Sequence, residues 1–330
     1  MNEFEKRVLK TIVDNKLIIS GDTVVVGFSG GPDSTTLLHV LNKINKEGII
    51  NFNIIAAHVN HGLRENAKLD EDFVKEYCEK NNIPLEIKHV NLREMAQKEK
   101  RGLEDMGRIV RYAFFEEIAN KYDNCSIAIA HNKKDSVETM LMNMFRGCGL
   151  NGLRGIEVSE GRYIRPLVNE NRQEIEEYIA GEGIVPRIDE SNSDNTYTRN
   201  KIRNTVIPYI EKEFNPNSID SMTRLAEIVR ESDDYLNAKT EEAYNQLILS
   251  KTDDEIILNL KEFNKQSVVI KKRIIFKAIQ NLCGTTKNID KVNLEDIIKL
   301  CDNNIGNKYL MPNKNVKVEL KNKKLSIQKK

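Results

Sequence analysis

The sequence has few cysteines, no long apolar run and almost no net charge, and each shortage excludes a class of protein. The five cysteines form no C-x-x-C pair and show no regular spacing, which argues against structural zinc, an iron–sulfur cluster and a disulfide framework. No apolar run approaches the roughly 20 residues of a membrane helix, and the first residues lack the basic-then-apolar pattern of a signal peptide. We therefore expect a cytoplasmic protein with reduced thiols and no membrane association.

A net charge of +1 conceals an uneven distribution of charge along the 330 residues. From Asn303 to the end there are eight lysines and one acidic residue, Glu319. A basic tail of this kind is typical of surfaces that meet phosphate backbones. A solvated tail that keeps the protein soluble is an equal alternative.

A glycine-rich turn joins a short apolar strand to a helix near the start of the chain. The β-branched run 24–26 predicts a buried strand, and the residues from Thr35 onward predict a helix. The chain must turn between them, where Gly30 and Gly31 allow backbone conformations closed to other residues. Backbone amides and the positive end of the helix then point at one place. The turn therefore predicts a site for the phosphates of a nucleoside triphosphate.

The other residues of this turn have separate predicted roles. Ser29 and Ser34 supply hydroxyl donors, and Pro32 stiffens the turn. Asp33 either caps the helix or holds Mg²⁺. The alternative is a well-capped turn without a ligand. No Gly-Lys-Ser/Thr follows the glycines, so the turn is not a Walker loop.

Strands alternate with helices through the first half of the chain. Further strands are predicted at 53–60, 85–90 and 126–131, with helices at about 64–81, 103–121 and 135–145. This order predicts an α/β fold with a doubly wound parallel sheet. Ligands bind at the carboxyl ends of such strands, which brings Ser29, His58 and His131 to one edge.

Polar residues follow two of these strands and one helix carries a row of charges. His58 is followed in the sequence by His61 and Arg64, and this group indicates nucleotide contact. A lone histidine at a strand end is more often a hydrogen-bonded residue without a ligand. Arg108 and Arg111 share one helix face and could grip a triphosphate or an RNA phosphate. Sequence alone favours the alternative, which is a surface ladder of Glu and Arg side chains.

An imidazole and two carboxylates follow the fourth predicted strand. His131, Asp135 and Glu138 stand at i, i+4 and i+7, so they can face one pocket. Such a set suits a cationic amine, because it can hold an ammonium group and remove a proton before the amine attacks. The alternative is that the acids only cap the first turn of a helix.

The second half of the chain differs in composition from the first. The polar stretch 189–204 ends in three cations and one aromatic residue, which favours RNA contact over a plain linker. From about 214 the pattern predicts a long helix at 218–249, a short strand at 255–260 and a basic hairpin at 316–327. We expect a catalytic domain at 1–213 and a mostly helical RNA-binding domain at 214–330.

Five segments together carry a family resemblance. The turn Ser29-Gly30-Gly31-Pro32-Asp33-Ser34 resembles the SGGxDS pyrophosphate loop (PP-loop) of the N-type ATP pyrophosphatases. The whole set resembles the tRNA(Ile)-lysidine synthetases. Its members are the turn, the segments 58–64 and 108–112, His131-x-x-x-Asp135-x-x-Glu138 and the polar block 189–203.

This resemblance implies a ligase that uses ATP and Mg²⁺. AMP is transferred to the C2 carbonyl oxygen of the wobble cytidine in a CAU-anticodon isoleucine tRNA, and free L-lysine then displaces the AMP. The implied ATP-binding residues are Ser29 to Ser34, His58 and Arg111, with Mg²⁺ on Asp33. The implied lysine-binding residues are His131, Asp135 and Glu138. The implied tRNA-binding residues are Arg64, Arg108, Asn192, Asp194, Tyr197, Arg199, Asn200 and Arg203.

The segment after the fourth strand departs from the family pattern. The family usually has His-His-x-Asp-Asp-Gln, whereas Asn132 and Lys134 replace one His and one Asp here. That change supports an alternative function, a catalytically impaired tRNA-binding module. A tRNA cytidine thiolase is a further alternative, but it needs paired cysteines. The sequence leaves both a monomer and a homodimer open.

Overall fold

The computed structural model describes residues 1–63, 67–187, 197–303 and 308–330. Contacts divide the chain into two compact units, Met1–Glu227 and Ile228–Lys330, so the division falls inside helix α10 (Ser218–Leu247). Residues 214–227, which the sequence assigned to the second domain, belong to the first unit. The reason is packing, because Ile219 and Met222 contact a small apolar cluster of that unit. In the described residues no helix is long and apolar enough to cross a membrane.

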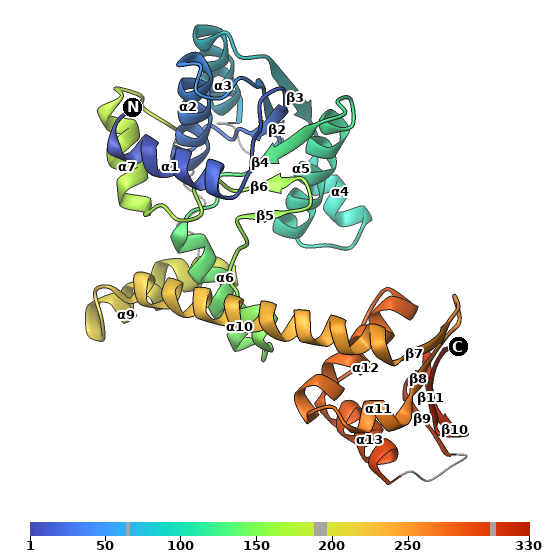
Figure 1. Ribbon diagram of the computed structural model, residues 1–330. Coiled ribbons are helices and arrows are strands. Elements are labelled where there is room, and N and C mark those ends of the chain that lie inside the picture. The colour runs from blue at the N-terminus through green and yellow to red at the C-terminus, as the bar shows by residue number, and fades with distance from the viewer. Residues whose placement is uncertain (64–66, 188–196, 304–307) are drawn as a thin grey trace. The chain divides into compact units, whose positions relative to one another are not determined.

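The first unit is built on a six-stranded sheet in the order β3-β2-β1-β4-β6-β5 (Figure 1). All neighbours pair in parallel except β5 and β6. At the centre Val25 is paired with Ile55 on one side and Ile127 on the other. The strands are β1 (Thr23–Gly27), β2 (Asn53–Asn60), β3 (Leu85–His89), β4 (Cys125–Ala128), β5 (Ser159–Glu160) and β6 (Tyr163–Ile164).

Helices cover both faces of this sheet because successive residues of β1 point to opposite sides. Val24 and Val26 are buried in one apolar cluster with side chains of α1, α2, α3 and α7. Val25 is buried in another with side chains of α5. The helices are α1 (Glu3–Asp14), α2 (Pro32–Lys46), α3 (Ala67–Asn81), α4 (Leu92–Lys98), α5 (Leu103–Ala119), α6 (Lys133–Phe145) and α7 (Arg172–Gly181). The predicted doubly wound sheet is confirmed.

Short helical segments complete the first unit. A 3₁₀ turn, η1 (Leu150–Leu153), follows α6. Helix α8 (Thr198–Lys201) runs through a π-helical segment, η3 (Ile202–Val206), into α9 (Ile207–Glu213). A π-helical turn widens the backbone by one residue and is common at functional sites.

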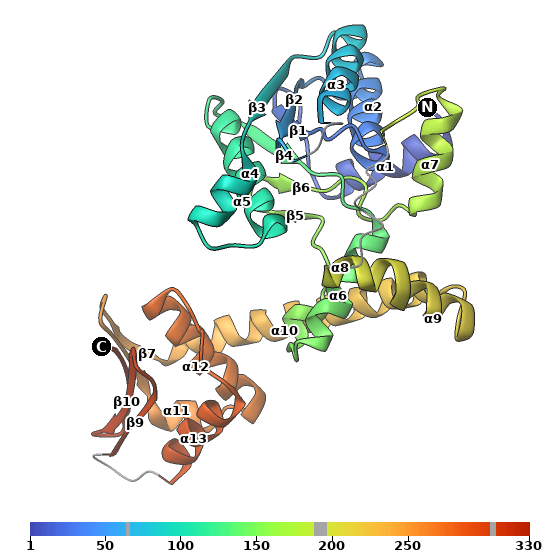
Figure 2. The same cartoon turned by 180° about the vertical axis from the view of Figure 1, so that it is seen from behind.

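The second unit is a five-stranded antiparallel sheet with helices α11, α12 and α13 packed on it (Figure 2). The sheet order is β7-β8-β11-β10-β9. Its strands are β7 (Ile248–Lys251), β8 (Glu255–Asn259), β9 (Lys308–Asn313), β10 (Val316–Lys321) and β11 (Lys324–Lys329). Its helices are α11 (Leu260–Asn264), α12 (Val268–Cys283) and α13 (Lys291–Asp302).

This unit contains more sheet than the sequence predicted. The hairpin of β10 and β11 and the strand β8 are where the sequence placed them. The two edge strands were missed, since β7 continues the apolar spacing of α10, and β9 has no buried side chain and contains Pro312. Edge strands need only one partner and little apolar alternation, so their sequence signal is weak.

Candidate active site

The glycine turn after β1 has a backbone conformation that favours glycine. The helix that follows it has amides that are open to a ligand. Gly30 has φ +84°, and a Cβ at that position would lie 3.2 Å from the ring of Phe73. Gly31 occupies the N-cap of α2, where no described side chain accepts a hydrogen bond from the first turn. Helix α2 then begins with Pro32, whose missing amide costs nothing there. The remaining first-turn amides and the helix dipole suit an anion.

The serine hydroxyls of the turn are engaged within it. The Ser29 amide donates to the Ser34 Oγ at 3.2 Å, and that hydroxyl donates to the Gly31 carbonyl at 3.0 Å. The two hydroxyl oxygens are 3.0 Å apart. Their first role is therefore to fix the shape of the turn, and direct contact with phosphate stays a prediction.

His58 contacts the backbone just before the glycine turn. It is buried, and its Nδ1 lies 2.9 Å from the Phe28 carbonyl oxygen, to which the Nδ1–H donates. Burial lowers the pKa of His58 below its ordinary value, which favours the neutral ring. The structure thus gives His58 a positioning contact next to the turn.

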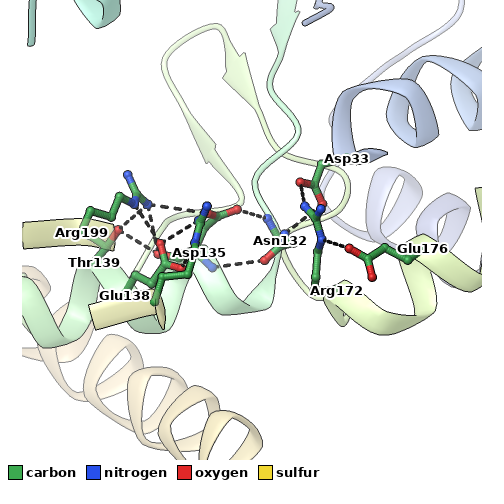
Figure 3. Close-up of polar contacts among 9 residues, drawn as sticks. Asp33, Asn132, Asp135, Glu138, Thr139, Arg172, Glu176 and Arg199 are labelled. Atoms are coloured by element: carbon green, nitrogen blue, oxygen red, sulfur yellow. Dashed lines mark hydrogen bonds and ion pairs between the residues drawn. The ribbon is translucent and has the colours of Figure 1, made fainter. Parts of the chain in front are cut away.

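Asp33 connects the turn to two other elements at the same sheet edge. Its carboxylate accepts a hydrogen bond from the Asn132 side chain at 3.0 Å and forms an ion pair with Arg172, at the start of α7 (Figure 3). Burial raises the pKa of Asp33 above its ordinary value, while Arg172 opposes the shift and the like charge of Asp135 adds to it. The carboxylate is thus a half-buried anion with two partners.

Asn132 and Asp135 start helix α6 with a capping box. The Asn132 side chain accepts from the Asp135 amide at 3.1 Å, and the Asp135 carboxylate accepts from the Asn132 amide at 3.0 Å. Asn132 therefore joins Asp33 of the turn to Asp135 of the acidic site. Asn132, one of the residues that depart from the family pattern, thus links the glycine turn to the acidic site.

The two acids on α6 are paired with two arginines from the segment around α8. Arg203 reaches both acids, with Nη2 2.7 Å from Asp135 Oδ1 and Nε 2.6 Å from Glu138 Oε1. Arg199 Nε lies 2.9 Å from the other oxygen of Glu138. Glu138 is fully buried, whereas both arginines are about a quarter exposed. Figure 3 shows this cluster beside the Asp33 contacts.

These ion pairs affect two roles that the sequence predicted, amine binding by the acids and tRNA binding by the arginines. Asp135 and Glu138 were expected to bind an amine, and here guanidinium groups occupy them. Arg199 and Arg203 were expected to bind tRNA, and here they point into the protein. A cationic substrate and these arginines would therefore compete for the same oxygens.

His131 precedes the capping box at the end of β4. In the described residues its Nδ1 is buried without a hydrogen-bond partner, and no hydrogen bond joins it to Asp135 or Glu138. Burial, with smaller contributions from Arg199, Arg165 and other arginines, lowers its pKa to about 3. The ring is therefore neutral, but so low a pKa makes it a weak proton acceptor, so this arrangement does not favour the predicted role of His131 as a base.

The other predicted contacts are spread around this edge. Arg108 is exposed, with its guanidinium 5.2 Å from the centre of the Tyr112 ring. Arg111 is exposed and its Nε donates to the Gly107 carbonyl at 3.4 Å. Tyr197 and Asn200 lie at the start of α8. Arg64, Asn192 and Asp194 lie outside the described residues.

Sequence reasoning missed three partners of the site. Arg172 had no predicted role, and nothing in the sequence links it to Asp33. The Arg187 amide donates to the Gly30 carbonyl at 2.9 Å, and its side chain pairs with Asp70. Asn132 was noted only as a departure from a pattern. Its spacing to Asp135 is that of a capping box, and this signal could have identified it.

Comparison with known proteins gives relatives for most of the chain. The family model of the PP-loop domain matches residues 1–210. The tRNA(Ile)-lysidine synthase of Clostridium acetobutylicum is 40% identical over 308 residues, which cover 93% of this chain and 66% of that protein. The enzyme of the same name from Clostridioides difficile is 38% identical over 312 residues, covering 94% and 67%. This chain thus spans about two thirds of the length of these relatives.

Among solved structures, the U34-tRNA thiolase NcsA from Methanococcus maripaludis is similar in fold. The TM-score is 0.56 at 24% identity, and the match covers 69% of this chain and 79% of that chain. That protein was solved with its [4Fe-4S] cluster. At this identity the likeness concerns the fold alone.

The buried acid cluster predicts a large effect on stability. Glu138→Ala leaves two guanidinium groups in a partly buried place without their main partner, so the free energy of unfolding should fall by about 3 to 5 kcal/mol. Glu117→Ala is the matched control, because Glu117 of α5 forms an exposed pair with Lys88 of β3 and its loss should leave stability almost unchanged. Urea unfolding followed by circular dichroism measures both. Equal stability of the two variants would contradict the pairing described for Glu138.

The depressed pKa of His131 predicts a pH dependence. The folded protein binds this proton only near pH 3, whereas the unfolded chain binds it near the ordinary value of 6.5. Protonation therefore favours unfolding, and His131 should make stability fall by up to about 1.4 kcal/mol per pH unit below about 6.5. We expect the difference in unfolding free energy between wild type and His131→Gln to decrease with that slope from about pH 6.5 to 5. A difference that does not vary with pH would contradict the buried neutral imidazole.

Proposed function

This chain belongs to the tRNA(Ile)-lysidine synthase family, with a PP-loop domain in its first unit, and on that premise we propose that it joins free L-lysine to a cytidine of tRNA. The target is C2 of the wobble cytidine in the isoleucine tRNA with a CAU anticodon. ATP first transfers AMP to the C2 carbonyl oxygen and releases pyrophosphate. The side-chain amine of lysine then forms the new carbon–nitrogen bond and displaces AMP, so the enzyme is a ligase.

One structural observation supports this proposal above the others. The glycine turn and the acidic site are joined through Asn132, which donates to Asp33 and forms the capping box with Asp135. A phosphate on the turn and an amine at the acids would thus lie at adjoining positions of one sheet edge. Adenylation followed by amine attack needs both groups near the same pyrimidine.

The first step uses the groups around the turn. The open amides at the start of α2 would hold the leaving pyrophosphate, and Arg111 would neutralise charge near the adenylate. Asp33 is a hard oxygen ligand of the kind that Mg²⁺ takes. Because Arg172 already binds one of its oxygens, Mg²⁺ would have to displace that guanidinium. The bound ion would add charge compensation for the phosphates.

The second step uses the acids of α6. Two carboxylates and two guanidinium groups balance in charge, so the ammonium group of lysine can pair with Asp135 and Glu138 only when an arginine withdraws. RNA phosphates are strong partners for arginine. Binding of tRNA by Arg199 and Arg203 would therefore release the acids for lysine, and a released carboxylate would then take the amine proton.

The structure weakens both alternatives. A catalytically impaired module rested on the altered segment, yet Asn132 contributes hydrogen bonds to Asp33 and Asp135. A thiolase needs paired cysteines, and the sequence contains no C-x-x-C pair. Burial also raises the pKa of the Cys78 and Cys301 thiols to about 12, which opposes thiolate chemistry there.

Mass analysis of reacted tRNA tests the proposed function directly. The protein is incubated with ATP, Mg²⁺, lysine and a CAU-anticodon isoleucine tRNA transcript. The tRNA is then digested with a nuclease, and the masses of its fragments are measured by mass spectrometry. We expect the anticodon fragment to gain the mass of one lysine less one water, with one AMP released per adduct. Binding of the transcript without any adduct or AMP would favour the impaired module.

Asp33→Ala separates chemistry from binding. Loss of the carboxylate removes a contact to Arg172 and the proposed Mg²⁺ ligand, so lysine-dependent AMP release should fall by at least about 100-fold. Affinity for tRNA should stay within about twofold of wild type in filter binding. Asp14→Ala, in an exposed pair on α1, is the control and should leave both values unchanged. Full activity of Asp33→Ala would remove this residue from the mechanism.

A further inference from the structure

A hollow of about 470 Å³ lies between helix α5 and the β5–β6 hairpin of the first unit. No function assigned so far uses it as a whole. The side chains that line it are three arginines, two tyrosines and two glutamates, namely Arg108, Arg162, Arg165, Tyr112, Tyr163, Glu116 and Glu160. Flat rings combined with guanidinium groups are the usual surface for single-stranded RNA.

The aromatic part of the hollow is ready to stack on a flat ligand. The rings of Tyr112 and Tyr163 lie 5.0 Å apart at 37°, and the guanidinium group of Arg108 lies over the Tyr112 ring. Tyr163 is held in place because its hydroxyl donates to Glu116 at 2.6 Å. In the described part of the chain, Arg108 makes no hydrogen bond or ion pair, so its charge is available to a ligand.

The basic part of the hollow has unused donors. The Arg165 side chain is 6% exposed, and its Nε has no hydrogen-bond partner among the described residues. One terminal nitrogen donates to the Glu157 carbonyl at 2.8 Å. The other is 3.4 Å from Glu160, whose side chain is 78% exposed and therefore a weak partner. A buried guanidinium with spare donors is suited to a phosphate.

The hollow adjoins the candidate active site. Strand β6 pairs in parallel with β4, so that Ile164 is beside Ala128 and Arg165 follows at the carboxyl end of β6. His131 comes three residues after Ala128, at the same edge of the sheet. The arginines Arg165 and Arg108 are among the charges that lower the pKa of His131, which agrees with their closeness.

We propose that this hollow binds one nucleotide of the RNA substrate, with its base against Tyr112 and Arg108 and its phosphate on Arg165 and Arg162. The inference rests on the proposed function, since it takes RNA as the substrate. A nucleotide next to the modified cytidine would be held here while that cytidine lies at the active site. A free nucleotide such as ATP offers the same base and phosphate, so the experiment must separate the two sources.

Substitution of Tyr112 tests the stacking contact in the full chain. Tyr112→Leu removes the ring and should weaken binding of a CAU anticodon stem-loop by about 5- to 100-fold, the range for loss of one base–aromatic stack. Tyr112→Phe keeps the ring and should stay within about twofold of wild type. Fluorescence anisotropy gives the RNA affinity, calorimetry gives the ATP affinity, and circular dichroism checks that both variants are folded.

Arg162→Gln tests the phosphate contact independently, because Arg162 is exposed and its loss should not affect folding. The slope of log affinity against log salt should decrease by about 0.7 to 1, as expected for one lost phosphate contact. Lys10→Gln, in an exposed pair on α1, is the matched control and should keep the wild-type slope.

The outcomes are distinct. Weaker RNA binding by Tyr112→Leu with unchanged ATP affinity supports the proposal. Weaker ATP binding with unchanged RNA affinity overturns it in favour of a free-nucleotide site, and unchanged affinity for both shows that the hollow is not a subsite. Wild-type protein that forms lysidine while Tyr112→Leu binds RNA normally would refute this inference and leave the proposed function intact. Absence of any RNA modification by wild-type protein would instead refute the proposed function.

Discussion

The candidate site depends on one buried interaction, the pairing of Glu138 with two guanidinium groups. A fully buried carboxylate is costly unless cations and hydrogen-bond donors surround it. Arg199 and Arg203 supply both, and in doing so they tie the segment around α8 to helix α6. The π-helical turn that contains Arg203 belongs to the same arrangement, since that residue reaches Glu138 and Asp135 at once.

The geometry of the site follows from where helices begin. Helix α2 begins after β1 with a bare glycine cap, and α6 begins after β4 with a closed capping box. The first therefore leaves amides open to a ligand, whereas the second uses its cap to orient Asp135. Since β1 and β4 are neighbours in the sheet, the two starts are side by side, and a single amide, Asn132, connects them.

Much of the fold, and less of the site, could be predicted from the sequence. Apolar runs such as 24–26 predicted the strands because a central parallel strand is buried on both faces. The glycine turn and the acids on α6 were found from local spacing. The direction of Arg199 and Arg203 was not, because a polar segment without periodicity gives no sign of what it packs against. The pairing of Arg172 with Asp33 joins residues 139 positions apart, and only the tertiary fold brings them together.

The cluster around Glu138 also sets an order for assembly during synthesis. Both of its arginines come more than 60 residues later in the chain than the acid itself. A nascent chain that ends near residue 190 already contains the whole parallel sheet, yet its central acid has no cation. Contacts between distant parts of a chain form slowly, because loop closure comes first. The packing around Glu138 is therefore complete only after residue 203 has been synthesised, and until then water must solvate the carboxylate of Glu138.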